Sequence, residues 1–131
     1  MILASGAFDG VHAGHVSYLE AAAGLLQPQE VLVVAVAPDA YIRAVKRREP
    51  YWPFVDRLKT VEALSMVDFG VPHGVDGVSS AVLALGPRLL VKGADWQGRM
   101  AADVREACEA VGTEILFVPE SQTRHTSEVR R

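Results

Sequence analysis

The sequence predicts an α/β fold in which helices cover both faces of a five-stranded parallel sheet. Three observations lead to this prediction. Short apolar runs rich in β-branched residues recur along the chain, longer stretches with helical spacing separate them, and glycine or proline marks many of the boundaries. Strands that alternate with helices form right-handed βαβ units. We therefore expect a Rossmann-like three-layer sandwich, formed as a single domain over residues 1–131.

The first half of the chain contributes two strands and two helices to this expectation. Residues 1–5 and 31–37 are nearly continuous apolar runs, as strands buried on both faces are. Residues 15–26 place apolar side chains at three- and four-residue steps, which predicts a helix. Residues 53–66 continue the same spacing behind Pro53, a residue favoured at the first helical position.

The second half repeats the pattern. Strands are expected over residues 67–71, 88–91 and 114–118. The helical stretches over residues 75–85 and 101–111 each end at a glycine, the residue that most often follows a helix. Ligands of such sheets bind beyond the carboxyl ends of the strands, where the strand order reverses. The residues that directly follow the strands are therefore the candidate site residues.

Composition and charge exclude several classes of protein. The chain has 131 residues, of which 50% are hydrophobic and 22% charged, and this is typical of a globular protein. The formal net charge of -3 argues against a nucleic-acid partner. No apolar run approaches the roughly 20 residues that cross a membrane, and no signal peptide is recognisable. With Cys108 as the single cysteine, a cytoplasmic location is expected.

The loop after the first strand is the most informative segment. Residues 6–15 read GAFDGVHAGH and lead directly into a helix. The free N–H groups and the dipole at a helix N-terminus favour an anion. His12 and His15, three residues apart around Gly14, can point to one side of that helix. Spacing alone leaves two other interpretations open, namely solvent-exposed histidines and a metal-binding pair.

This string resembles the signature of the cytidylyltransferase-like nucleotidyltransferases, whose HxGH motif is related to that of class I aminoacyl-tRNA synthetases. Residues 12–20 (HAGHVSYLE) and 90–93 (LVKG) are similar to the adenylyltransferase domain of bacterial heptose-phosphate enzymes. Residues 95–99 (DWQGR) and the chain length are similar to glycerol-3-phosphate cytidylyltransferase. The resemblance extends over nearly the whole chain.

The resemblance implies transfer of a nucleoside monophosphate from NTP, with ATP favoured, to a phosphorylated sugar such as a heptose 1-phosphate, with release of pyrophosphate. CTP with glycerol 3-phosphate or another alcohol phosphate is the alternative. A nucleotide-binding module that has lost turnover is a second alternative, because His125 and Glu128 depart from the family pattern. Mg²⁺ as cofactor and a homodimer, with Trp52 and Phe54 at a contact, are also implied.

The same resemblance assigns roles to individual residues. It implies that His12, His15 and Lys46 are catalytic and that Arg57 and Asp39 bind the acceptor. The implied nucleotide-binding residues are Gly6, Ala7, Phe8, Asp9, Gly14, Lys92, Gly93, Asp95, Thr126 and Ser127. The ligands of the metal ion stay unknown. The chemistry needs donors and cations rather than a covalent nucleophile, because the attacking phosphate is already an anion.

The residues themselves leave several roles open. Asp9 fits either a loop cap or an indirect Mg²⁺ ligand. Trp96 fits either stacking on a base or covering the sheet edge. Arg57 also fits a surface salt bridge within its own helix, which would contribute little. The basic run over residues 43–48 fits a solvated turn, and so does His73.

Overall fold

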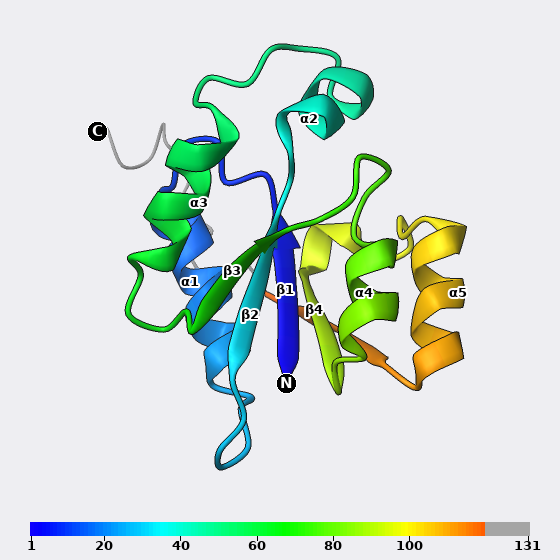
Figure 1. Ribbon diagram of the computed structural model, residues 1–131. Helices are drawn as coiled ribbons and strands as arrows, with labels where there is room; N and C mark the ends of the chain where they lie inside the picture. Colours follow the sequence, from blue (N-terminus) through cyan, green and yellow to red (C-terminus); the bar gives the residue numbers. More distant parts are fainter. Residues whose placement is uncertain (120–131) are drawn as a thin grey trace.

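The computed structural model describes residues 1–119, and Figure 1 shows how they are layered. One sheet of five parallel strands has the order β3-β2-β1-β4-β5. The strands are β1 (Ile2–Gly6), β2 (Leu32–Val36), β3 (Phe69–Pro72), β4 (Leu89–Gly93) and β5 (Glu114–Val118). The predicted α/β fold with a five-stranded parallel sheet is confirmed.

Helices cover both faces of this sheet. The first face carries α1 (Ala13–Ala23) and α3 (Phe54–Glu62), and the second carries α4 (Ser79–Leu85) and α5 (Ala102–Val111). A short helix, α2 (Asp39–Val45), lies above the carboxyl ends of the strands, and a 3₁₀ turn, η1 (Ala94–Trp96), follows β4. Within residues 1–119, no helix is both long and apolar enough to cross a bilayer.

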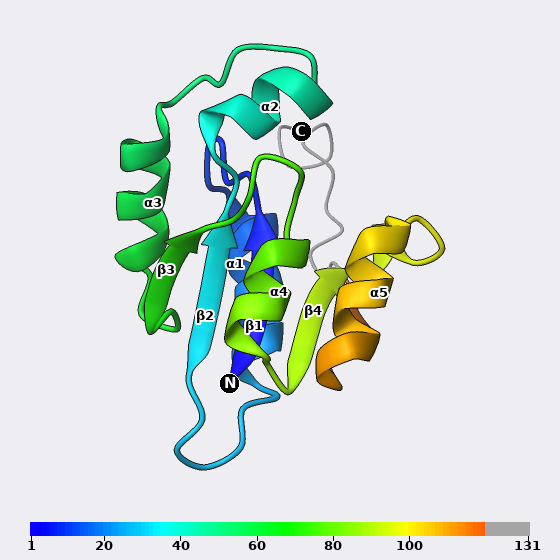
Figure 2. The same cartoon turned by 45° about the vertical axis from the view of Figure 1, so that its right-hand side comes forward.

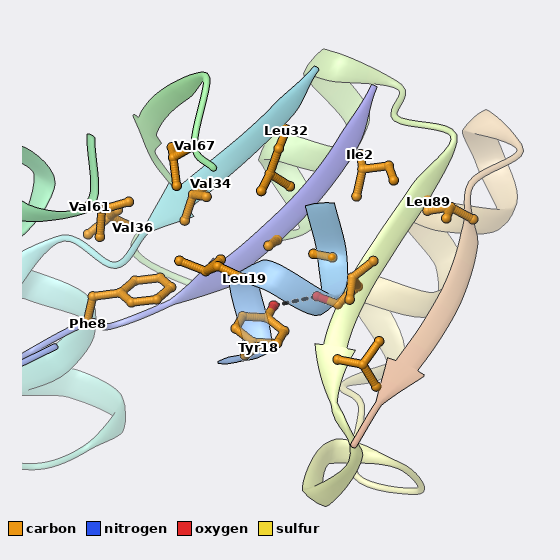
Figure 3. Close-up of a cluster of buried hydrophobic side chains, with 14 residues drawn as sticks. Ile2, Phe8, Tyr18, Leu19, Leu32, Val34, Val36, Val61, Val67 and Leu89 are labelled. Carbon is orange, nitrogen blue, oxygen red and sulfur yellow. Dashed lines mark hydrogen bonds between the residues drawn. The ribbon is translucent and has the colours of Figure 1, made fainter. Parts of the chain in front are cut away.

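Two clusters of buried side chains hold the layers together. Alternate residues of a strand point to opposite faces, so Ile2 and Ala4 pack against α1 while Leu3 packs against α4 and α5. Figure 3 shows the first cluster, in which Leu19 of α1 and Val61 of α3 meet the strands. Because both faces are covered, the central strands read as continuous apolar runs.

Several elements differ from the sequence expectation. Two helices end earlier than expected, α1 at Ala23 instead of residue 26 and α3 at Glu62 instead of residue 66. Residues 39–45 form a helix that was not expected, because Ile42 is its single buried residue and the segment therefore shows no apolar stripe. The third strand begins at Phe69 instead of residue 67, since Val67 still bonds the turn that ends α3. The helix expected from residue 75 begins at Ser79, because Gly74 and Gly77 first pair in a tight turn.

The strand order reverses at β1. The chain runs from β1 through β2 to β3 on one side, and β4 then lies on the other side of β1. β1 and β4 pair only as far as Ala4 and Val91. The Tyr18 hydroxyl takes over beyond this point, since it accepts the N–H of Ser5 and donates to the Val91 carbonyl (Figure 3). The two strands therefore separate at their carboxyl ends and open a crevice there.

Candidate functional site

A cavity of about 470 Å³ occupies this crevice, a volume typical of small-molecule sites. The sequence-predicted residues that line it are Gly6, Ala7, Phe8, Asp9, His12, Gly14, His15, Lys46, Lys92, Gly93 and Asp95. Trp96 and Arg48 also line it, together with Ser5, Gly10 and Tyr18, which the sequence analysis did not single out. Ser5 ends the first apolar run, and Tyr18 lies within the HAGHVSYLE segment, but neither side chain is distinguished by its sequence position alone.

The histidine pair is held by hydrogen bonds at the start of α1. Nδ1 of His12 accepts the N–H of Gly14 at 3.0 Å, and Nδ1 of His15 accepts the N–H of His12 at 3.1 Å. This is a reciprocal capping arrangement in which histidines replace the usual residues. Because each Nδ1 accepts, a neutral ring carries its proton on Nε2. Both residues therefore present an Nε2–H donor, and both line the cavity.

His15 is neutral in the free protein at pH 7. Burial, with a smaller contribution from the neighbouring His12, lowers the pKa of His15 to about 4. The two ring centroids are 4.1 Å apart. A Cβ atom at Gly14 would lie 2.9 Å from Cε1 of His12, so a glycine is needed between the histidines to keep this ring in place.

The turn that follows β1 is strained at Phe8. This residue has a φ of +52° although it carries a large side chain, a conformation that costs about 1–2 kcal/mol. Its ring is buried and leaves no room for a Cβ atom at Gly6, which would lie 2.9 Å from it. The packing of Phe8 therefore fixes the path of the backbone along the cavity wall.

Asp9 acts as a cap for a distant segment. Its carboxylate accepts the N–H groups of Tyr51 at 2.8 Å and Trp52 at 2.9 Å, and a guanidinium N–H of Arg48 at 2.7 Å. Burial alone would raise the pKa of Asp9, but these partners together hold it below its usual value. Both carboxylate oxygens are engaged, so the structure favours the loop cap over the metal ligand.

Lys92 is a buried cation between β4 and β1. Its ammonium donates to Oγ of Ser5 at 3.0 Å and lies 4.5 Å from the centre of the Trp96 ring. Burial lowers the pKa of Lys92 to about 8, while the Asp95 carboxylate opposes this shift and Lys46 reinforces it. The amine is mostly charged at pH 7. Trp96 thus packs against a cation and forms part of the cavity wall.

Lys46, at the end of α2, also lines the cavity. It is the residue at which α2 ends, and Arg47 beyond it adopts a left-handed φ of +59°. Two other cations of the basic run are paired, because Arg43 bonds Glu49 at 3.0 Å and Arg48 bonds Asp9. Among residues 1–119, Lys46 has no such ion-pair partner, and its side chain lines the main cavity.

Arg57 and Asp39 lie outside the main cavity. Arg57 is only 1% exposed, so the surface salt bridge within its own helix is a wrong interpretation. Its guanidinium donates to the carbonyls of Ala7, Ala37 and Trp52 and to the carboxylate of Asp39. The side chain thus joins the ends of β1 and β2 to the loop before α3. It lines a separate cavity of about 260 Å³, which also contains Thr60.

The expected site also includes two hydroxyl residues near the C-terminus and a metal ion. Thr126 and Ser127 lie outside the described residues. Within residues 1–119, no three histidine, cysteine, aspartate or glutamate side chains gather in a way that could hold a metal ion. Asp95 is the cavity carboxylate without a side-chain partner in this part of the chain.

Comparisons with known proteins agree with the geometry. The family description "Cytidylyltransferase-like" matches residues 3–131. Over 120 residues the chain is 36% identical to the bifunctional protein HldE of Halorhodospira halophila, which covers 91% of this chain and 24% of that protein. Over 130 residues it is 32% identical to HldE of Coxiella burnetii, covering 98% and 26%. The chain thus spans about a quarter of the length of these curated relatives.

Solved structures show the same fold. The lipopolysaccharide core biosynthesis protein from Thermoplasma volcanium has a TM-score of 0.76 at 25% identity, covering 89% of this chain and 93% of that one. A protein of unknown function from Archaeoglobus fulgidus has a TM-score of 0.71 at 20% identity, which shows the fold alone. With the HxGH histidines in the crevice and the family match over nearly its full length, the chain belongs to the cytidylyltransferase-like family and is a nucleotidyltransferase.

Proposed function

We propose that this protein transfers a nucleoside monophosphate from NTP, with ATP favoured, to a phosphorylated sugar such as a heptose 1-phosphate, and releases pyrophosphate. The observation that carries the proposal is a single cavity lined by two Nε2–H donors and two lysines at the strand switch point. The similarity to HldE and the resemblance to heptose-phosphate adenylyltransferase domains support the choice of nucleotide and acceptor.

The reaction is a displacement at the α-phosphorus. An oxygen of the acceptor phosphate forms a bond to this phosphorus, while the bond to the bridging oxygen of the β-phosphate breaks and pyrophosphate leaves with the electron pair. No proton needs to be removed, because the acceptor phosphate is ionised at neutral pH. Catalysis therefore rests on positioning and on stabilisation of phosphoryl charge.

The histidines act on the leaving side of this reaction. His12 and His15 donate from Nε2 to the phosphate oxygens, and the positive end of the α1 dipole adds to the same effect. Because backbone hydrogen bonds hold both rings in place, they need no reorganisation when the charge develops. Thr126 and Ser127 are proposed to add hydroxyl and backbone donors to the β- and γ-phosphates.

The lysines act where the two substrates meet. Lys92 is held in place by Ser5 and Trp96, and Lys46 lies at the exposed end of a short helix. We assign Lys46 to the α-phosphate. The backbone at Gly6, Ala7 and Gly93 forms the floor on which the nucleotide would lie. For Asp95 we propose one of two roles, accepting a hydrogen bond from a ribose hydroxyl or lying near the metal ion.

Mg²⁺ is proposed to enter as the Mg–NTP complex. Asp95 is the cavity residue that would approach it, since the carboxylate of Asp9 is already engaged. When bound, the ion neutralises part of the phosphate charge.

Arg57 and Asp39 are proposed to serve the acceptor end indirectly. Their ion pair, 2.7 Å long, fixes the segments that follow β1 and β2. A homodimer is a further proposal from the resemblance, and a cytoplasmic location is a proposal from the single cysteine, Cys108. Trp52 is 55% exposed and could form a contact between copies, whereas Phe54 packs against the core of its own chain. Light scattering after size-exclusion chromatography tests the dimer.

Pyrophosphate release tests the proposed function. The purified protein would be incubated with Mg²⁺, with ATP or CTP, and with heptose 1-phosphate, other sugar phosphates and glycerol 3-phosphate. We expect release with ATP and a sugar phosphate, and none with a His15→Ala variant above background. Release only with CTP and an alcohol phosphate would favour the cytidylyltransferase alternative. NTP-dependent thermal stabilisation without any release would identify a module that has lost turnover.

A further inference from the structure

A second, smaller hollow adjoins the main cavity on the opposite face of the sheet. Its volume is about 90 Å³, and it lies among α2, the end of β3 and the starts of α4 and α5. Figure 2 shows α4 in front of the sheet and α2 above it. The residues that it shares with the main cavity are Ser5, Gly6, Ala7, Lys46, Lys92 and Trp96. We call it the His73 chamber and define it by Tyr41, His73, Val78, Met100 and Val104.

The position of the His73 chamber suits the incoming substrate. His12 and His15 lie on the α1 side of the end of β1, whereas the chamber lies on the α4 and α5 side. An α-phosphorus above the end of β1 would therefore have its leaving group toward the histidine pair and its free side toward the chamber. Displacement at phosphorus requires attacking and leaving oxygens that are roughly in line.

His73 faces this space as a hydrogen-bond acceptor. Its Nδ1 lies 2.7 Å from the carbonyl oxygen of Gly74, and a carbonyl can only accept, so Nδ1 carries the proton. Burial lowers the pKa of His73, which keeps the ring neutral at pH 7 and leaves a lone pair on Nε2. The side chain is 9% exposed, and Nε2 has no hydrogen-bond partner among residues 1–119.

The orientation of His73 is fixed by its neighbour. The Tyr41 ring of α2 packs edge-to-face on it, with the ring centroids 4.8 Å apart and an interplanar angle of 85°. A buried acceptor held rigidly without a partner calls for a donor from a ligand or from ordered water. The expectation of a solvated turn at His73 is therefore wrong.

The other residues that line the His73 chamber indicate what kind of ligand would donate a hydrogen bond to Nε2 of His73. Val78, Met100 and Val104 form an apolar side, while Lys46 and Lys92 lie at the mouth. The lysines attract a phosphate, and the apolar side suits a carbon skeleton. The volume of about 90 Å³ has room for roughly three groups of the size of a water molecule, each filling about 30 Å³, so that part of a polyol chain would enter it. A small polyol segment attached to a phosphate has this size and chemistry.

We propose that the His73 chamber binds the hydroxyl-bearing carbon part of the acceptor and that Nε2 of His73 accepts a hydrogen bond from one of its hydroxyl groups. His73 is then a specificity-determining residue for the acceptor. This inference rests on the proposed function, because it assigns the second substrate of the same reaction to a place. It assigns that substrate to the His73 chamber rather than to the cavity beside Arg57.

Three variants test whether the acceptor binds in the His73 chamber or in the cavity beside Arg57. His73→Asn keeps an amide donor for the Gly74 carbonyl but removes the acceptor at the Nε2 position. His73→Gln places an amide near that position and can supply an acceptor there. Thr60→Val alters the cavity beside Arg57 and serves as the matched control, because Thr60 lies outside both the main cavity and the His73 chamber. Thermal melting establishes that each variant is folded.

Steady-state kinetics with the best acceptor of the panel gives the readout. We expect His73→Asn to raise the KM for the acceptor about tenfold with less than a twofold change in the KM for NTP, and His73→Gln to recover most of the loss. A deoxy acceptor that lacks the bound hydroxyl should be used equally well by the wild type and by His73→Asn. An unchanged acceptor KM in His73→Asn, or a rise in Thr60→Val instead, overturns the proposal.

A binding measurement distinguishes failure of the proposed reaction from failure of the proposed acceptor site in the His73 chamber. If the wild type releases no pyrophosphate, the proposed function fails, and calorimetry then measures how glycerol 3-phosphate and sugar 1-phosphates bind in the presence of a non-hydrolysable NTP analogue. Binding that weakens about tenfold in His73→Asn but not in Thr60→Val would still support the His73 chamber. No binding of any of these compounds to the wild type, or equal binding to both variants, would overturn it.

Discussion

The histidines at the start of α1 and the histidine after β3 present opposite groups to the same region. His12 and His15 accept backbone N–H groups at Nδ1 and therefore expose Nε2–H donors. His73 donates from Nδ1 to a backbone carbonyl and therefore exposes an Nε2 acceptor. The adjoining backbone, and not the residue type, decides whether an imidazole suits a phosphate or a hydroxyl group. We propose that this difference divides the site into a nucleotide side and an acceptor side.

The largest effect is expected where the donor on the nucleotide side is removed. His15→Ala should lower kcat roughly 10²–10³-fold, as the loss of one oriented donor to a developing charge does. His15→Gln should lose less, because its amide can still donate near the Nε2 position. Stopped assays of pyrophosphate release measure both. A loss of kcat below about threefold in His15→Ala would show that this ring does not take part in the chemistry. The claim that the α1 histidines form the nucleotide side would then fail.

A smaller effect is expected at the cation between the two sides. Lys46→Ala should lower kcat roughly 10–100-fold and should weaken NTP binding less than that, if the lysine acts mainly on charge in the transition state. Arg43→Ala is the control from the same helix, since Arg43 forms an exposed ion pair of little energetic value. Equal losses in kcat and NTP affinity for Lys46→Ala would show that this lysine only binds the nucleotide and does not stabilise the transition state specifically.

Lys92 should make the free energy of unfolding depend on pH. The pKa of Lys92 is about 8 in the folded protein and about 10.5 in the unfolded chain, so the unfolded state binds more protons between these values. The free energy of unfolding should therefore rise by about 3 kcal/mol as pH increases from 8 to 10.5. Turnover, which needs the charged amine, should fall over the same range.

Lys92→Met isolates this contribution. The difference in unfolding free energy between this variant and the wild type, measured by urea denaturation, should change across that pH window. A difference that stays constant with pH would show that the Lys92 amine is not desolvated in the folded protein.

The smallest but most specific expectation concerns the proton positions. In ¹⁵N-labelled protein, long-range nitrogen–hydrogen NMR spectra should show His15 as the neutral Nε2–H tautomer and His73 as the neutral Nδ1–H tautomer at pH 7. His15 should stay neutral down to about pH 5, because its pKa is lowered to about 4. His73→Asn assigns the signals. The same tautomer at both residues, or a His15 pKa near 6.5, would contradict the comparison.

The two sides of the site differ in how far the sequence could predict them. Residues 6–15 are contiguous, so their motif and the helical pattern that follows are enough to indicate the nucleotide side. The acceptor side is assembled from α2, the end of β3 and the starts of α4 and α5. Its burial depends on contacts such as that of Tyr41 with His73, which no local pattern records.

Arg57 illustrates the same limit. Its position in a helix after an aromatic turn was compatible with a surface ion pair. The carbonyls that it binds come from Ala7, Ala37 and Trp52, three segments that meet only in the folded chain. The strand and helix pattern, in contrast, follows from the alternation of apolar residues along each segment, and the strands and longer helices agreed with it to within a few residues.

A crystal structure with the α,β-methylene analogue of ATP or CTP tests the central claim most directly. We expect phosphate oxygens within hydrogen-bond distance of Nε2 of His12 and His15, with the α-phosphorus above the end of β1 and the His73 chamber open beside it. A triphosphate bound elsewhere, or histidine rings turned away from it, would contradict the account.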